Sequence, residues 1–446
     1  MSAHSPLGYQ HESAAHADPG AVGTRRRVLW LSSLVPYPPK GGVLQRSYNL
    51  LRETARYHDV DLLAFNQRAL MRAYYPGGSE EGLADARRVL SGLCRRMEFV
   101  DIPSDRISGG KHLLALGSLL TRDPYTVNWQ KSARFARLCR EWAENGQYDL
   151  VHLDMITLGS YRELFGDTPV TLGHHNVESH LLQRRAENTA NPITRWYFAQ
   201  EGRRLARYEQ EQCSRYALNI TCSELDRERL HEITPESRTE VIPNGVDLEY
   251  FRPHDGAEQP DRLIFAGMLN WLPNRRAVEY IAHELWPRIK ASRPDACIDI
   301  VGPNPPESVL ALARQDRNFV VHGYVDDVRP YIDAAAVYLC PIKDGGGTKL
   351  KLLDAFAMRK AVVADPISCE GIEVEDGKHV ILASEPDEYV AAIERLLTDA
   401  SERARVGHSA QEFVQRNYSF AVIGRSLAEH FDRYGAGPSA AAKPTV

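Results

Sequence analysis

Residues 341–360 read PIKDGGGTKLKLLDAFAMRK, in the order strand, glycine loop and helix. An apolar run ends at Pro341, three glycines follow at 345–347, and a helix is predicted over 350–358. The first N–H groups of a helix lack intrahelical partners, and the helix dipole favours an anion beside them. The stretch therefore predicts a phosphate site at the carboxyl edge of a parallel α/β sheet.

Side chains near the glycines offer further contacts to a nucleotide. Thr348 adds a hydroxyl, Lys349 and Lys351 add cations, and Asp354 lies about two helical turns beyond the glycines. A carboxylate there accepts hydrogen bonds from a ribose diol, as acidic residues do in dinucleotide-binding folds. The segment is not a P-loop, because GxxxxGK[ST] is absent, and its alternative interpretation is a tight loop before a solvated helix. The predicted phosphate contacts are Gly345, Gly346, Gly347, Thr348, Lys349 and Leu350.

Apolar runs alternate with helical patterns along most of the chain. Runs that end in glycine or polar residues indicate parallel sheets covered by helices on both faces. One series begins at 27–34 and a second at 262–266, so we expect two doubly wound, Rossmann-like α/β domains that face each other across a cleft. The expected parts are a disordered tail (1–24), a first domain (25–257), a second domain that carries the predicted phosphate site (258–418), a helix that crosses back to the first domain (419–435) and a second disordered tail (436–446).

Composition narrows the class of protein. With 446 residues the chain is too long for one ordinary core, and its net charge of −5 argues against nucleic acid as a partner. The seven cysteines are scattered without a CxxC pair, which argues against a disulfide framework and fits the reducing cytoplasm. No apolar run approaches the ~20 residues of a membrane helix. We therefore expect a cytoplasmic protein, with peripheral contact at the inner membrane surface left open.

The segment GGGTKLKLLDAFA resembles the corresponding segment of the retaining glycosyltransferases of family 4, which have the GT-B fold. That family carries a glutamate, seven further residues and a second glutamate that leads into a helix of small residues. Asp354 matches the second acid, whereas Gly346 stands at the position of the first, with Asp344 nearby. Sugar transferases of bacterial exopolysaccharide clusters are the branch that this version resembles best.

Other segments match the family in the same order along the chain. Gly41 and Gly42 correspond to the glycine pair that approaches phosphate, and His175 in GHHNVES corresponds to the histidine that contacts the donor sugar. Ser223 and the run 241–251 (VIPNGVDLEYF) are shared features with a structural role. The resemblance further implies donor contacts at Gly267, Tyr324, Val325 and Glu370.

One departure from the family concerns charge. The family places Arg and Lys on the first loop of the second domain, where both touch the diphosphate, but this chain has Met268 and Asn274 there. Stabilising the leaving diphosphate is the main electrostatic task of such a transfer. Arg275, Arg276 and Lys349 are the candidates for the replacement charge.

The resemblance implies transfer of a hexose-type sugar from a nucleotide-sugar donor to a hydroxyl of a glycan or lipid-linked acceptor, with retention of configuration. Its catalytic candidates are His175 and Glu370 at the sugar and Lys349 at the phosphate. No metal or other cofactor is expected, because HxH and HExxH are absent and the DxD at 59–61 opens a predicted strand. Two alternatives remain: a non-hydrolysing sugar-nucleotide epimerase, and a non-catalytic GT-B partner subunit.

Overall fold

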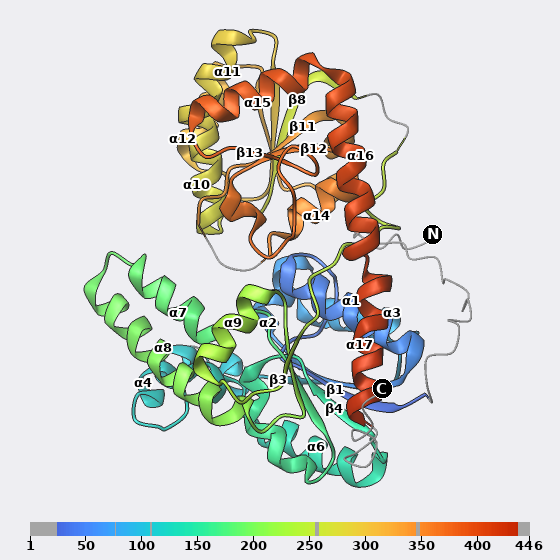
Figure 1. Cartoon of the computed structure of the whole chain (residues 1–446). Helices are drawn as coiled ribbons and strands as arrows, with labels where there is room; N and C mark the ends of the chain where they lie inside the picture. Colours follow the sequence, from blue (N-terminus) through green and yellow to red (C-terminus); the bar gives the residue numbers. More distant parts are fainter. Residues whose placement is uncertain (1–24, 76, 108, 255–257, 345–347, 436–446) are drawn as a thin grey trace. The chain divides into compact units, whose positions relative to one another are not determined.

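The computed structural model describes residues 25–75, 77–107, 109–254, 258–344 and 348–435. The expected disordered tails and the glycines Gly345, Gly346 and Gly347 lie outside the described residues. The chain divides into an N-terminal unit, Asp18–Pro243 with Ile423–Val446, and a C-terminal unit that includes Asn244–Val422. Each unit contains one parallel sheet with helices around it (Figure 1).

The sheet of the N-terminal unit has seven strands in the order β3-β2-β1-β4-β5-β6-β7, all parallel. The order changes direction between β1 and β4, and ligands bind beside such a switch point in doubly wound sheets. The central strands are buried on both faces, which accounts for their continuous apolar runs. The strands are β1 (Arg27–Ser32), β2 (Asp59–Asn66), β3 (Cys94–Asp101), β4 (Leu150–Leu153), β5 (Val170–Gly173), β6 (Leu218–Thr221) and β7 (Thr239–Val241).

The helices of the N-terminal unit include a long hairpin, formed by α7 and α8, and a final helix, α17. Their bounds are α1 (Gly42–Tyr57), α2 (Arg68–Tyr74), α3 (Ser79–Leu90), η1 (Pro103–Arg106), α4 (Gly110–Ser118), α5 (Tyr125–Trp129), α6 (Ala133–Gly146), η2 (Ile156–Phe165), α7 (Glu178–Glu187), α8 (Pro192–Cys213), α9 (Glu224–Ile233) and α17 (Phe420–Gly435). No helix among the described residues is long and apolar enough to cross a bilayer.

The sheet of the C-terminal unit has six parallel strands in the order β10-β9-β8-β11-β12-β13. The strands are β8 (Gln259–Ala266), β9 (Cys297–Val301), β10 (Phe319–Gly323), β11 (Ala335–Cys340), β12 (Ala361–Ala364) and β13 (Ile381–Leu382). The helices are α10 (Leu272–Tyr280), η3 (Ile281–Leu285), α11 (Trp286–Ser292), α12 (Glu307–Gln315), α13 (Arg329–Ala334), α14 (Leu350–Ala357), η4 (Pro366–Cys369), α15 (Pro386–Thr398) and α16 (Ala400–Asn417). The expected fold class of two doubly wound α/β domains is confirmed.

The last helix, α17, packs on the N-terminal unit although it follows the C-terminal unit in sequence (Figure 1). Arg26 at the start of the sheet donates to the carbonyl of Asp432 (3.1 Å). Phe431 lies against Trp30 and His152 in the middle of the sheet, with ring centroids 6.4 and 5.4 Å away. A side chain at Gly424 would collide with Glu53 of α1, so the helix approaches α1 closely at that glycine.

Two features of the fold differ from the sequence expectation. The units divide after Pro243, earlier than the boundary expected at 257, because Val246 and Phe251 already pack into the C-terminal core. Strand β3 was not expected, because its sequence CRRMEFVD is charged and partly exposed at the sheet edge. Its Arg96 pairs with Asp61 of β2 (2.9 Å), so charge pairing across the strands takes the place of apolar burial there.

Candidate active site

The carboxyl ends of three neighbouring strands in the C-terminal unit meet at glycines. Gly267 follows β8, Gly302 follows β9 and Gly323 ends β10. The N–H of Gly267 donates to the carbonyl of Val301 (2.9 Å), and the N–H of Gly302 donates to that of Gly323 (2.8 Å). A side chain at Gly302 would collide with the carbonyl of Gly267. These glycines therefore let the three strand ends approach one another closely at this edge of the sheet.

Lys351 occupies the space that a side chain at Gly267 would fill. Its Nζ donates to Oδ1 of Asn274 (2.6 Å) and lies 4.7 Å from the ring centre of Phe265. Nδ2 of Asn274 in turn donates to the carbonyl of Met268 (2.9 Å). The ammonium group of Lys351 on α14 therefore reaches the first turn of α10, at Asn274, where the resemblance predicts a lysine.

Burial lowers the pKa of Lys351 to about 8, and the nearby charge of Lys349 lowers it further, while Cys340 opposes the change. Lys349 is itself buried, with 4% of its surface exposed. Two lysines thus lie beside the start of α14, in an environment whose burial disfavours positive charge. An anionic ligand at this place would relieve that cost.

The other candidates for the replacement charge have acidic partners. Arg275 pairs with Glu279 along α10 (3.2 Å), and Arg276 pairs with Asp344 (2.8 Å). Both guanidinium groups are about half exposed. Lys351, by contrast, contacts Asn274. The sequence analysis identified Lys351 as a cation of this segment but did not include it among the predicted site residues. The signal was its position in TKLK, two residues after Lys349.

Asp354 lies one turn beyond Lys351 on α14. Burial raises the pKa of Asp354 well above its usual value, Lys351 opposes this change, and the negative charge of Asp247 adds to it. Asp247 comes from the run VIPNGVD, and its Oδ1 accepts from the N–H groups of Glu249 and Tyr250 (3.1 and 3.2 Å). The carboxyl group of Asp354 suits hydrogen bonds with neutral partners such as ribose hydroxyls.

Two buried oxygens in this part of the unit have no hydrogen-bond partner among the described residues. They are Oγ1 of Thr348, immediately before α14, and Oε2 of Glu370, immediately after η4. Buried polar atoms are normally satisfied, so unpaired ones near a glycine-rich loop mark a place for ligand groups. Leu350, the first residue of α14, is buried and contributes its backbone there.

The segment after β10 holds the predicted base contacts. The ring of Tyr324 is 55% exposed, and its hydroxyl donates to Oδ1 of Asp326 (3.2 Å). Val325 packs against the core of the unit, which fixes the backbone of this segment. Both residues follow Gly323, whose φ of 69° turns the chain at the sheet edge.

In the N-terminal unit, the predicted glycine pair lies at the start of α1. Gly41 has φ 83° and precedes the helix, and Gly42 is its first residue. Both are exposed, and no side chain caps the first turn of α1. The first N–H groups of this helix therefore have no capping side chain, and the phosphate contact at this place stays a prediction.

His175 belongs to a buried hydrogen-bonded chain at the same sheet edge. Its Nε2 lies 3.1 Å from Oδ1 of Asp154, whose Oδ2 accepts from the hydroxyl of Ser47 (2.6 Å). These residues come from the ends of β5 and β4 and from α1, which are adjacent around the switch point. Burial would raise the pKa of Asp154, but His175 and the two hydrogen bonds hold it below its usual value. The sequence predicted the histidine and missed its two partners.

Neighbouring histidines differ from His175 in their surroundings. Burial lowers the pKa of His152 and of His174 to about 4, so both are neutral at neutral pH. His152 contacts the hydroxyl of Thr171 (2.9 Å), and His174 contacts Oδ1 of Asn219 (3.1 Å). Both therefore have structural partners within the sheet, whereas His175 pairs with a carboxylate.

The DxD sequence lies at the amino end of β2. Asp59 pairs with Arg25 (2.8 Å), and Asp61 pairs with Arg95 and Arg96 (3.4 and 2.9 Å). Both aspartates therefore form ion pairs with arginines, at the sheet edge opposite the glycines. Within the described residues, no group of three or more His, Cys, Asp and Glu side chains is arranged to hold a metal ion.

Comparison with known proteins assigns a class to this fold and site. Residues 40–250 match the model of Glycosyltransferase Family 4, and residues 260–399 match the model of Glycosyl transferases group 1. Solved structures with the same two-domain fold include sucrose-phosphate synthase from Thermosynechococcus elongatus, 15% identical with a TM-score of 0.65 over 92% of this chain and 100% of that one. The chain therefore has the GT-B fold, and two glycosyltransferase family models match successive parts of it.

Two further relatives are informative. HepE of Anabaena, solved with UDP-glucose, is 15% identical with a TM-score of 0.61 over 92% of this chain and 100% of that chain. An uncharacterized 44.6 kDa protein in the cps region of Klebsiella pneumoniae is 23% identical over 205 residues. That match covers 44% of this chain and 53% of the relative, so the chain spans about half the length of the curated protein that it matches.

Proposed function

We propose that the chain transfers a hexose-type sugar from a nucleoside-diphosphate sugar to a hydroxyl group of a glycan or lipid-linked acceptor, with retention of configuration. The observation that carries this proposal is the set of groups at the carboxyl edge of the C-terminal sheet. Lys351 lies beside Asn274, and Thr348 and Glu370 each have a buried oxygen without a partner among the described residues. Cations, free hydroxyl and carboxyl oxygens and open backbone match a nucleotide-sugar.

The roles follow from the chemistry of each group. Lys349, Lys351 and the amides at the start of α14 would bind the diphosphate, with Asp354 on the ribose. The backbone at Tyr324 would bind the base. Glu370 would bind hydroxyls of the sugar, and His175 of the N-terminal unit is assigned to the sugar as well.

The reaction that we propose is a substitution on the face of the sugar where the leaving group departs. The acceptor oxygen forms a bond to the anomeric carbon while the bond from that carbon to the phosphate oxygen breaks. The acceptor proton passes to the departing phosphate, so the products are a glycoside and a nucleoside diphosphate. The protein positions both substrates and stabilises the charge that develops on the diphosphate.

The relatives support the donor class and the biological setting. HepE was solved with UDP, with UDP and glucose, and with UDP-glucose, and a variant of TarM from S. aureus was solved with UDP. The relative from Klebsiella pneumoniae lies in a cps region. Together with the resemblance to exopolysaccharide-cluster enzymes, these names favour synthesis of an exopolysaccharide or another cell-surface glycan.

The role of Asp354 has a direct test in donor binding. Asp354→Ala is expected to raise the Kd of the preferred nucleotide-sugar by about 10- to 100-fold, because two hydrogen bonds to ribose hydroxyls are lost and each is worth ~0.5–1.5 kcal/mol. Ligand-observed NMR with UDP-, GDP-, ADP- and dTDP-sugars measures this change and identifies the base.

The matched control is Asp295→Ala, which removes an exposed carboxylate before β9, at the opposite edge of the same sheet. This variant is expected to bind the donor as the wild type does. Equal donor affinity in folded Asp354→Ala protein would remove Asp354 from the site, and no binding of any donor by the wild type would favour a non-catalytic partner subunit.

A further inference from the structure

The N-terminal unit exposes an unusual row of large apolar side chains around α4. Leu113 and Leu116 lie on one face of the helix, with 68% and 66% of their surface exposed, and Leu120 follows two residues after its end with 92%. Ile107, just before the helix, is also mostly exposed. Scattered exposed leucines are common, but several on one short helix indicate a surface that meets another apolar phase.

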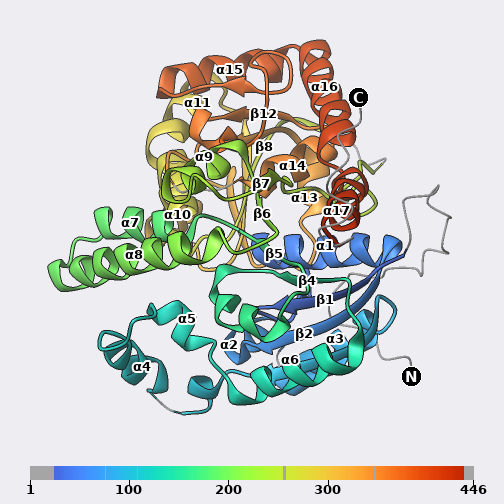
Figure 2. The same ribbon diagram turned by 60° about the horizontal axis from the view of Figure 1, so that its bottom comes forward.

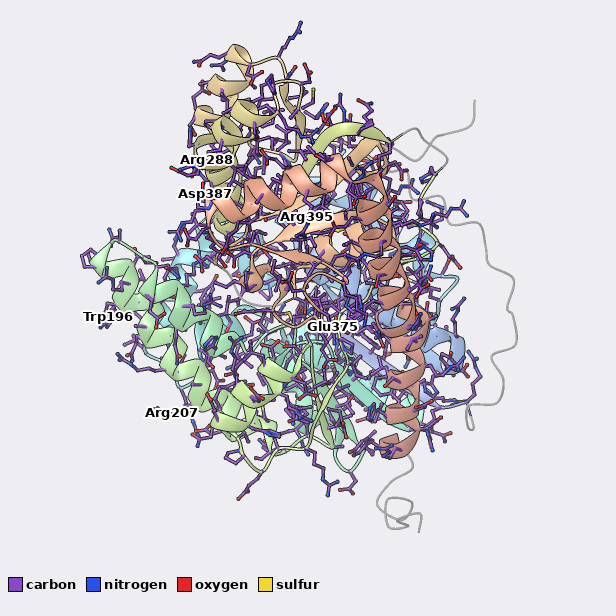
Figure 3. All side chains as sticks on the ribbon, turned by 45° about the horizontal axis from the view of Figure 1, so that its top comes forward. Trp196, Arg207, Arg288, Glu375, Asp387 and Arg395 are labelled. Atoms are coloured by element: carbon purple, nitrogen blue, oxygen red, sulfur yellow. The ribbon has the colours of Figure 1, made fainter. Side chains whose placement is uncertain are left out.

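A second exposed apolar group lies on the hairpin of α7 and α8. Ile193 and Trp196, in the first turns of α8, are 77% and 58% exposed. Trp196 points away from the rest of the unit near the end of the hairpin (Figure 3). Trp196 therefore reaches solvent at the start of the aromatic run 196–198.

The helices α4 and α8 are neighbours, so the two groups belong to one side of the unit. Nη2 of Arg204 on α8 donates to the carbonyl of Ser118 at the end of α4 (2.7 Å) and to that of Asp123 (2.7 Å). Figure 2 shows α4 beside the hairpin. We call Ile107, Leu113, Leu116, Leu120, Ile193 and Trp196 the α4–α8 surface.

The segments that carry this surface are basic. Residues 103–132 and 178–207 contain ten Lys and Arg but five Asp and Glu. Burial raises the pKa of Glu178 to about 7, so this acid contributes little to the surface charge, whereas Glu201 and Arg204 pair and cancel each other. Arg203 and Arg207 are exposed on α8, and Arg207 projects from the hairpin in Figure 3.

A second basic segment of the N-terminal unit does not belong to this surface. The basic stretch 131–140 has apolar residues at helical spacing, but it forms α6, in which Phe135, Cys139 and Trp142 are buried in the core of the unit. Its apolar face is therefore already occupied. The α4–α8 surface is where apolar side chains reach solvent.

We propose that the α4–α8 surface docks on a lipid bilayer that contains anionic headgroups. Leucine, isoleucine and tryptophan side chains enter the boundary between headgroups and acyl chains, as in helices that lie in a membrane interface. Arginines beside them contact phosphate groups, which gives the charge complementarity that selects anionic lipid over a neutral apolar partner. The inference stands independently of the proposed transfer reaction.

Vesicle sedimentation tests the proposal with the full chain. The wild type is expected to bind vesicles of phosphatidylcholine with about one-third phosphatidylglycerol, to bind pure phosphatidylcholine more weakly, and to lose binding as salt rises. Leu113→Ser with Leu116→Ser, and separately Arg203→Glu with Arg207→Glu, are each expected to weaken binding about tenfold or more.

Matched controls come from exposed residues of the C-terminal unit. Leu272→Ser removes an exposed leucine, and Arg314→Glu reverses an exposed charge; both are expected to bind vesicles as the wild type does. Thermal unfolding shows whether each variant is folded. The proposal is wrong if folded wild type does not bind anionic vesicles, or if both double variants bind them normally. It is also wrong if light scattering shows a dimer for the wild type and a monomer for the leucine double variant. That result would assign the surface to a second copy of the chain.

Discussion

Replacing Lys351 with methionine is expected to lower kcat/KM for the nucleotide-sugar by about 10²–10³-fold, the usual loss when one preorganised group that stabilises developing charge is removed. Methionine keeps most of the volume of the side chain and removes its charge. Lys351 contacts Asn274, the position at which the resemblance to family 4 predicts a lysine. Binding of the nucleoside without phosphates is expected to change little, because the ammonium group acts on the diphosphate.

The same lysine predicts how donor binding depends on pH. Only the ammonium form attracts the diphosphate, and burial lowers the pKa of Lys351 to about 8 in the free protein. Donor affinity is therefore expected to be constant below about pH 8 and to fall by up to about tenfold per pH unit above it. A calorimetric titration at several pH values measures this profile.

Lys378→Met is the matched control for Lys351→Met, since Lys378 is an exposed lysine of the same unit that pairs with Glu375 (2.7 Å). Its activity and pH profile are expected to equal those of the wild type. If folded Lys351→Met protein kept the fall in affinity above pH 8, another group would be responsible. If it kept full kcat/KM, the replacement charge would have to come from elsewhere, with Lys349 next.

Asp154→Asn is expected to lower kcat by about 10- to 100-fold with a smaller effect on the KM of the donor. The substitution keeps the shape of the side chain but removes the charge that orients His175 and replaces one of the two acceptor oxygens with an NH2 donor. We assign Asp154 as a positioning residue, which acts on the sugar through His175. Steady-state kinetics of the variant separates kcat from KM.

A double-mutant cycle distinguishes positioning from a merely structural role. If Asp154 acts through His175, the variant with both Asp154→Asn and His175→Ala should be about as active as His175→Ala alone. Independent, additive losses would contradict the assignment. Ser47→Ala is expected to show a smaller loss in the same direction, because it removes one hydrogen bond from the carboxylate and leaves the histidine contact in place.

The fold could be predicted from sequence because its central strands are buried on both faces and therefore stand out as apolar runs. Runs such as LVHL and AVVA end where the structure ends β4 and β12. Strand β3 could not be predicted in this way, because Arg95, Arg96 and Glu98 give this edge strand the charged composition of a loop. The boundary after residue 243 could not be predicted either. The packing of Val246 and Phe251 into the second core, and not a change in composition, decides where the C-terminal unit begins.

The candidate site could be predicted only in part. Motifs point to backbone and side chains that lie close in sequence, such as Thr348, Lys349 and Asp354, but not to contacts across the sheet. Lys351 meets Asn274, 77 residues away in the chain, so no local pattern identifies the pair. Asp154 gave a weak signal, as a polar residue directly after an apolar strand, which is where parallel sheets place ligand-binding groups.

The central claim is that the chain moves a sugar from a nucleotide donor to a separate acceptor. The most direct measurement follows the donor by ¹H and ³¹P NMR, with and without a mixture of bacterial glycan and lipid-linked acceptors. The account predicts that nucleoside diphosphate appears only when acceptor is present, and that the sugar is recovered in a glycoside with the donor's anomeric configuration. Conversion of the donor to an epimeric nucleotide-sugar without acceptor, or an unchanged donor in every mixture, would contradict it.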